Sequence, residues 1–180
     1  IPQSIDFYNR LVRAIEILGQ EAPTRATIRT EREQLTQQRG QADAELGRLA
    51  AAEAEVGRAQ ADYASARRTL EVDFVGKNRK GGNERSEENG GLLGVLVAAE
   101  TAAKRNPSQA NRDEVRRLTK AFEAADKAEK AAAGRLAQAQ TKLDATKAET
   151  GGAEAINGRK EAIDKRLAQL EPSQTTTKAR

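Results

Sequence analysis

Apolar and small side chains recur every seventh residue over a long stretch of the chain. The series consists of Ile28, Leu35, Ala42, Leu49, Val56, Tyr63 and Leu70. A second series, three residues further on, is polar at its start and then alanine-lined, and its clearest members are Glu31, Gln38, Glu45, Ala52, Ala59 and Ala66. Two such series are the a and d positions of a heptad repeat. They predict a first coiled-coil arm over residues 23–75.

A second pair of heptad series follows later in the chain. One position holds Val115, Phe122, Glu129, Leu136 and Leu143, and the other holds Leu118, Ala125, Ala132, Ala139 and Thr146. Asn111 followed by Glu114 fits a capping box at the start of this helix. Past Gly151 and Gly152 a similar stripe resumes one residue out of step. The pattern predicts a second arm over residues 107–171 with a kink or register adjustment at the two glycines.

Shorter segments flank and connect the two arms. Residues 1–22 form a predicted N-terminal amphipathic helix, with Ile5, Tyr8, Val12 and Ile15 on one face, which Pro23 is expected to end. Residues 76–106 combine a flexible glycine-rich loop with a short apolar helix that begins at residue 92. Residues 172–180 carry almost nothing to bury, and we expect a disordered tail.

Two helical arms of comparable length can bury their apolar stripes by folding back on each other. The predicted fold is therefore all-α: an elongated antiparallel coiled-coil helical hairpin, with the additional short helices completing a three- or four-helix bundle. Alanines on both arms allow the helices to approach closely. Gly40, Gly47 and Gly134 share an outer heptad position, where they either seat a third helix or simply lie on exposed surface.

Composition supports helices and excludes a thick globular core. Of 180 residues, 34 are Ala, whereas Leu, Ile, Val and Phe together number only 31. A sandwich, barrel or doubly wound domain needs more large apolar side chains than this. A net charge of +4, four prolines and periodic apolar residues favour order over disorder. No apolar run approaches the roughly 20 residues of a membrane-spanning helix.

The chain contains no His and no Cys, which removes several kinds of chemistry together. Imidazole bases, thiolate nucleophiles, zinc sites with nitrogen or sulfur ligands, haem ligation and disulfides are excluded. The carboxylates alternate with basic residues at helical spacing, as in solvated surface pairs. Gly90, Gly91 and Gly94 open a helix but lack the preceding strand and the Lys-Ser/Thr pair of phosphate-binding loops. We expect no enzyme, no catalytic residue, no cofactor and no metal.

Basic residues give an isoelectric point near 9.5. The candidate anion-binding residues are Lys77, Arg79 and Lys80, in the glycine-rich loop. No aromatic stacking platform accompanies them, so a solvated basic surface is the alternative and nucleic acid is the disfavoured partner.

The apolar run that starts the short helix is the candidate partner-binding segment. Its large side chains are Leu92, Leu93, Val95, Leu96 and Val97. They lie on nearly every side of the helix, which implies that they are buried somewhere. Either they form an interaction tip for a protein or membrane surface, or they fold back and cap the end of the bundle.

Two stretches resemble the alanine-rich helical hairpins of periplasmic membrane-fusion adaptors from efflux and secretion systems. They are residues 49–70, LAAAEAEVGRAQADYASARRTL, and residues 135–143, RLAQAQTKL. The β-rich lipoyl halves that flank those hairpins have no counterpart here. The resemblance implies a shared helix-packing chemistry rather than a shared activity.

The function expected from the sequence is a non-catalytic coiled-coil structural or interaction subunit of a larger assembly, such as a virion, a secretion or envelope complex, or a scaffold. Its partners are expected to be proteins, with a homo-oligomer left open. The alternative is a protein that binds nucleic acid or another anionic surface through its basic loop and tail. The sequence does not determine the compartment, although an extracytoplasmic or virion-associated setting is favoured.

Overall fold

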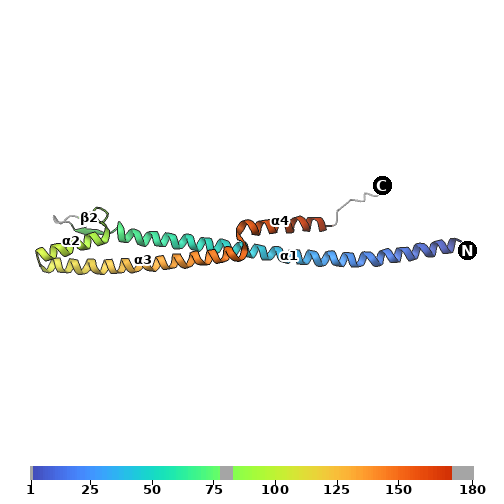
Figure 1. The fold of residues 1–180 in the computed structure, drawn as a ribbon, viewed down its shortest axis with the longest axis horizontal. Coiled ribbons are helices and arrows are strands. Elements are labelled where there is room, and N and C mark those ends of the chain that lie inside the picture. Colours follow the sequence, from blue (N-terminus) through green and yellow to red (C-terminus); the bar gives the residue numbers. More distant parts are fainter. Residues whose placement is uncertain (1, 78–82, 172–180) are drawn as a thin grey trace. The chain divides into compact units, whose positions relative to one another are not determined.

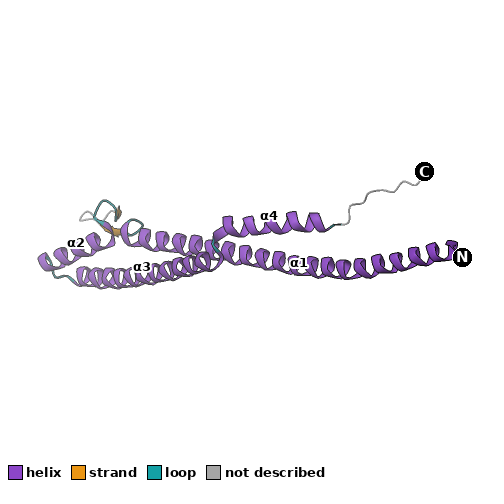
Figure 2. Cartoon of the chain, turned by 45° about the vertical axis from the view of Figure 1, so that its right-hand side comes forward, coloured by secondary structure: helices purple, strands orange, loops and turns teal. Residues whose placement is uncertain are grey.

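The computed structural model describes residues 2–77 and 83–171. The elements in chain order are α1 (Pro2–Glu71), β1 (Val75–Lys77), β2 (Asn83–Arg85), α2 (Gly91–Arg105), α3 (Gln109–Thr150) and α4 (Gly152–Leu170). Helices dominate these residues, as Figure 2 shows, and the predicted all-α helical hairpin is confirmed. The chain divides into two compact units, one from residues 1–48 and 149–180 (unit 1) and one from residues 49–148 (unit 2).

In unit 2 the C-terminal part of α1 pairs with α3 (Figure 1). The residues buried at this seam are mostly the predicted heptad positions: Leu49, Ala52, Ala59, Ala125, Ala132, Ala139 and Leu143. Lys142 Nζ lies 2.6 Å from the Glu55 carboxylate, and the Tyr63 hydroxyl donates to Glu129 over 3.4 Å. Because later residues of α1 meet earlier residues of α3, the two helices run antiparallel.

In unit 1 the helix α4 lies antiparallel to α1 (Figure 1). Ile156 of α4 is fully buried, and Ala42 of α1 is 3% exposed. Ion pairs fix the register, since Arg166 meets Glu31 while Lys160, six residues earlier, meets Asp43. The second predicted arm therefore pairs with the first arm along both of its parts, within one chain.

The predicted end of a separate N-terminal helix at Pro23 is wrong. The helix α1 runs without a break from Pro2 to Glu71, through Pro23. Proline removes one backbone donor and costs a helix interior about 3 kcal/mol, but this cost is local. Helix-favouring residues on both sides, including Ala22 and Arg25, continue the same helix.

The described parts of the glycine-rich segment after α1 contain two short strands that were not predicted. Residues 75–77 and 83–85 form a two-stranded antiparallel ladder in which Val75 pairs with Arg85. The Ser86 backbone N–H donates to the Phe74 carbonyl at 2.7 Å, which continues the pairing toward α2. The prediction of a flexible loop overlooked these backbone bonds, which require no apolar side chain. Residues 78–82 lie outside the described part of the chain.

The two glycines at the end of α3 produce a full helix break. Gly151 and Gly152 have φ of 80° and 85°, a left-handed conformation that glycine adopts without steric cost. Thus α3 ends at Thr150 and α4 begins at Gly152, where only a kink or register adjustment was predicted. A β-carbon added at Gly47 or Gly134 would meet no neighbouring atom within 4 Å, so no third helix from the described chain is seated on them.

Candidate interaction surfaces

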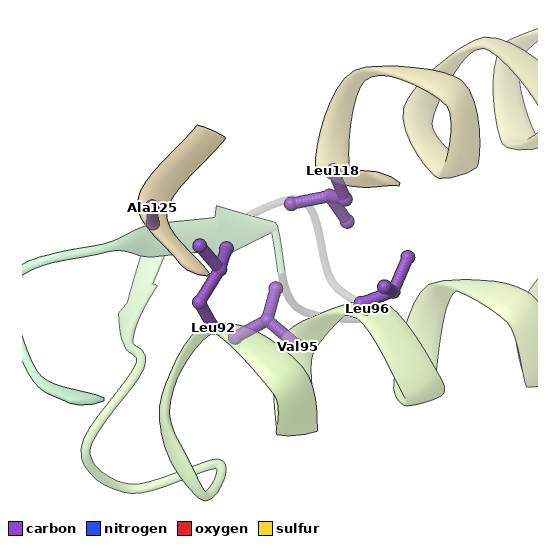
Figure 3. Close-up of a cluster of buried hydrophobic side chains, with 5 residues drawn as sticks. All are labelled: Leu92, Val95, Leu96, Leu118 and Ala125. Atoms are coloured by element: carbon purple, nitrogen blue, oxygen red, sulfur yellow. The ribbon is translucent and has the colours of Figure 1, made fainter. Parts of the chain in front are cut away.

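The helix α2 packs most of its predicted partner-binding residues inside unit 2. Leu92, Val95 and Leu96 are between 1% and 8% exposed and form a cluster with Leu118 and Ala125 of α3, as Figure 3 shows. Phe74 and Phe122 are partly buried and pack against this cluster. These three residues of α2 are therefore part of the chain's own core and are not presented to a partner. Their burial against α3 agrees with a segment that folds back onto the chain, while capping of the bundle's end stays a prediction.

Two glycines allow α2 to approach its neighbours closely. A side chain at Gly91, where φ is 73°, would meet the Glu71 carbonyl, and one at Gly94 would collide with the Asn89 carbonyl. The Gly91 N–H donates to the Ser86 carbonyl, and the Gly94 N–H donates to the Gly90 carbonyl at 3.3 Å. The backbone N–H groups of Gly91 and Gly94 are thus bonded within the chain. Close packing is the physical reason for this glycine pattern.

The other two predicted residues of α2, Leu93 and Val97, are 53% and 51% exposed. They lie four residues apart and therefore on the same side of the helix. Leu93 also borders an open hollow of about 510 Å³, whose lining consists of Leu70, Glu71, Val72, Glu87, Gly90, Gly91, Leu93 and Phe122. The lining of this hollow is largely apolar and includes the two acidic residues Glu71 and Glu87. Partner binding by Leu93 and Val97 stays a prediction.

A larger exposed apolar surface lies on the N-terminal part of α1. Eight of the eleven exposed large apolar side chains found among the described residues fall between Ile5 and Leu18. Tyr8 is 65% exposed and Ile15 is 60% exposed. The sequence predicted an amphipathic helix here and expected its apolar face to be buried in the bundle. The described residues of the chain leave that face uncovered.

In unit 1, ion pairs between side chains of α4 and α1 hold the two helices together. Four ion pairs connect α4 to α1: Arg166 with Glu31, Arg39 with Asp164, Lys160 with Asp43, and Arg159 with Glu45. Glu31 and Glu45 occupy heptad positions where a seam is usually apolar. Their partners lie more than 100 residues away, so no local sequence signal identifies the pairing.

Electrostatic shifts at these pairs oppose acid–base catalysis. Hydrogen bonds from Arg166, Lys160 and Lys142 lower the pKa values of Glu31, Asp43 and Glu55, respectively. A carboxyl that acts as a general acid near neutral pH needs a raised pKa. These three carboxylates therefore serve as partners of bases across the helix seams.

Two of the three candidate anion-binding residues lie outside the part of the chain that the structure describes. Arg79 and Lys80 lie outside the described residues, and Lys77 is described only by its place in β1. Elsewhere Arg117 lies over the Phe74 ring, 5.4 Å from its centroid, while also donating to Glu114. That contact was not predicted, and it uses a basic residue for internal packing. Anion binding by the loop stays a prediction.

Within residues 2–77 and 83–171, no group of acidic side chains is arranged to hold a metal ion. In the same residues, no helix combines the length and apolar character needed to cross a membrane. No protein-family model, curated protein or solved structure matches this chain. The function of the chain is therefore inferred from its own surfaces.

Proposed function

We propose that this chain is a non-catalytic coiled-coil interaction subunit of a larger assembly. The observation that carries the proposal is the exposed apolar surface on α1, from Ile5 to Leu18. Large apolar side chains gathered on one side of a helix are unfavourable in water and mark contact surfaces. A subunit that docks this surface on another molecule removes it from solvent.

The remaining described features support a structural role. The alanine seams bring the helices close together, and the long-range ion pairs hold their register without forming an enclosed polar site. The hollow beside Leu93 is open and its lining is mostly apolar. Substrate turnover usually needs a site that excludes water around positioned polar groups. Such an arrangement is not found among the described side chains.

The proposal is tested by the size of the native particle. An extract of the natural source is separated on a density gradient, and the chain is detected with an antibody. We expect it to sediment faster than the purified chain at the same concentration. The double variant Leu11→Gln, Ile15→Gln, produced in the same source, should shift to slower fractions. The control Ile17→Gln removes an exposed apolar side chain from the opposite side of α1 and should not shift.

Two outcomes contradict the proposal. If the wild-type chain in the extract sediments like the purified chain, no larger assembly contains it. If nuclease treatment releases the chain while the Leu11 and Ile15 substitutions do not, the anionic-surface alternative describes the protein better, since phosphate contacts would then hold it.

A further inference from the structure

The exposed apolar residues on the N-terminal part of α1 are regularly spaced. Its six central side chains are Ile5, Tyr8, Leu11, Val12, Ile15 and Leu18, which we call the N-terminal apolar face. Spacings of three and four residues place all six on one side of α1. All six are exposed, from 38% at Val12 to 65% at Tyr8.

The rest of the described chain does not cover this face. The helix α4 accompanies α1 as far as the Arg166 pair with Glu31 and ends at Leu170. Residues 171–180, EPSQTTTKAR, contain Pro172 and Ala179 as their only nonpolar residues. Among the described residues, the pairing of α4 with α1 extends to the ion pair at Glu31, whereas the exposed apolar surface runs from Leu18 toward the N-terminus. The N-terminal apolar face therefore lies on the part of α1 that α4 does not reach, and its apolar side chains suit pairing with a further helix.

Charge identifies the chemistry of the occupant. Residues 5–18 carry Asp6, Arg10, Arg13 and Glu16, so their net charge is zero. A helix that binds an anionic membrane surface carries an excess of Lys and Arg, and nucleic acid requires the same. The occupant must therefore be apolar and close to neutral along its contact surface.

A second copy of the chain has these properties, and its side chains match the face. In an antiparallel pair centred on Arg13, Tyr8 lies opposite Leu18 and Leu11 lies opposite Ile15, while Arg10 is level with Glu16. In a parallel pair each residue meets its own copy, with Tyr8 and Ile15 at a positions and Leu11 and Leu18 at d positions. Leucine at both d positions and a β-branched side chain at one a position favour a two-stranded coiled coil. The face is self-complementary in both directions.

The available area is of the right order for a stable contact. Phe7 borders the face and is 68% exposed, similar to Tyr8. Two aromatic side chains exposed to this degree offer roughly 200–300 Å². A standard interface buries about 800 Å² per partner, and the five aliphatic members of the face provide most of the remainder.

We propose that the N-terminal apolar face binds the same face of a second copy of this chain. This inference rests on the proposed function and names the partner. The contact is isologous, because the same patch is used by both copies. It leaves the helix pairing in units 1 and 2 unchanged.

The first test is the mass of the purified full chain. Sedimentation equilibrium over a concentration series should give at least twice the chain mass of 19.5 kDa for the wild-type protein. Leu11→Gln, Ile15→Gln should raise the dissociation constant at least tenfold without loss of helicity, since neither side chain is buried within the chain. Ile17→Gln replaces an exposed apolar side chain on the opposite side of α1; it is the control and should associate like the wild type.

The second test uses the absence of cysteine from the chain, which makes any disulfide attributable to an introduced residue. Under mild oxidation, Leu11→Cys should form a disulfide-linked dimer if the helices are parallel. A mixture of Leu11→Cys and Ile15→Cys chains should form the mixed dimer if they are antiparallel. Arg13→Cys, on the opposite side of α1, is the control and should crosslink much more slowly.

A wild-type chain that stays monomeric throughout the concentration series overturns the inference. So does crosslinking at Arg13→Cys as fast as at the apolar face. If the purified chain is monomeric but the density gradient still shows a large particle that needs Leu11 and Ile15, the face binds another protein. The proposed function then survives while the inference fails.

Discussion

Arg166 of α4 and Glu31 of α1 form a two-pronged ion pair within unit 1. Arg166 Nε donates to one carboxylate oxygen over 2.6 Å, and a terminal guanidinium nitrogen donates to the other over 3.1 Å. Glu31 occupies a heptad position that in most coiled coils is apolar. The pair explains how a polar seam position is tolerated, because the carboxylate remains near solvent and has a specific partner.

The stability of this contact should depend on pH. The hydrogen bond from Arg166 is the main cause that lowers the pKa of Glu31 below its ordinary value of 4.5. A carboxyl with a lowered pKa in the folded state contributes stability above its unfolded pKa and loses it as the pH falls through the folded value. The melting temperature, followed by circular dichroism, should therefore decrease below about pH 4.5.

The substitution Arg166→Gln should lower the melting temperature at pH 7 and make the decrease at acidic pH smaller. Lys165→Gln changes the same charge on the neighbouring residue of α4 and serves as the control. An acid transition that is equally steep in Arg166→Gln and in the wild type would show that this pair contributes nothing to the pH dependence.

The sequence predicted the seams well because burial in a helical pair follows the heptad directly. Ala132 and Leu118, assigned to one heptad series, are 0% and 1% exposed. The ion pairs that complete the polar part of the seam could not be predicted. Each joins residues far apart in the sequence, and the choice of partner depends on register, which a heptad fixes only in steps of seven residues.

The candidate site was predicted less well, for a related reason. An apolar stripe shows that a helix face must be buried, but it does not show which segment or molecule buries it. The run at Leu92 was the predicted interaction surface, yet Leu92 and Leu96 are buried, whereas Ile5 and Ile15 are exposed. Glycine at position 91 contributes to this outcome, because it lets the start of α2 approach the backbone at the end of α1, at Glu71. Such a tertiary contact leaves no periodic signal.

Enlarging the alanine seam should destabilise unit 2. Ala132 is fully buried between α3 and α1, so Ala132→Leu must push the helices apart or adopt a strained rotamer. Overpacking of this kind costs about 1–3 kcal/mol. Ala131→Leu adds the same side chain at an exposed neighbouring position and should change stability little. Urea unfolding of both variants gives the comparison, and equal midpoints would contradict close packing at Ala132.

Replacing an exposed helical glycine should have the opposite effect. No neighbouring atom lies within 4 Å of a β-carbon placed on Gly47, and its φ is not positive. Gly47→Ala should therefore stabilise α1 by up to about 1 kcal/mol, because alanine restricts the unfolded chain and favours the helix. A higher midpoint of urea unfolding is expected. A lower midpoint would instead indicate that a helix from another molecule is seated on Gly47.

The same substitution at Gly94 should be harmful. A β-carbon there would overlap the Asn89 carbonyl, which belongs to the backbone turn before α2 and has little room to move. Gly94→Ala should destabilise unit 2 by about 3 kcal/mol or more, since a backbone clash is harder to relieve than a side-chain clash. Urea unfolding measures the loss, and a stability equal to that of the wild type would mean that α2 is not held against this turn.

The two sides of α2 should respond differently to substitution. Leu96 is 8% exposed in the cluster with Leu118, so Leu96→Ala removes buried methyl groups and should cost about 2–5 kcal/mol. Leu93 is 53% exposed, and Leu93→Gln should change the free energy of unfolding by no more than about 0.5 kcal/mol. Urea unfolding of the two variants, measured side by side, separates the core residue from the surface residue.

A reversed order of these two effects would mean that α2 presents its Leu96 side to a partner and packs its Leu93 side inward. A mild effect of both would mean that α2 is not docked at all. Either result would restore the whole run from Leu92 to Val97 as a candidate partner surface. The expected order restricts that surface to Leu93 and Val97, beside the hollow that Leu70 and Phe122 help to line.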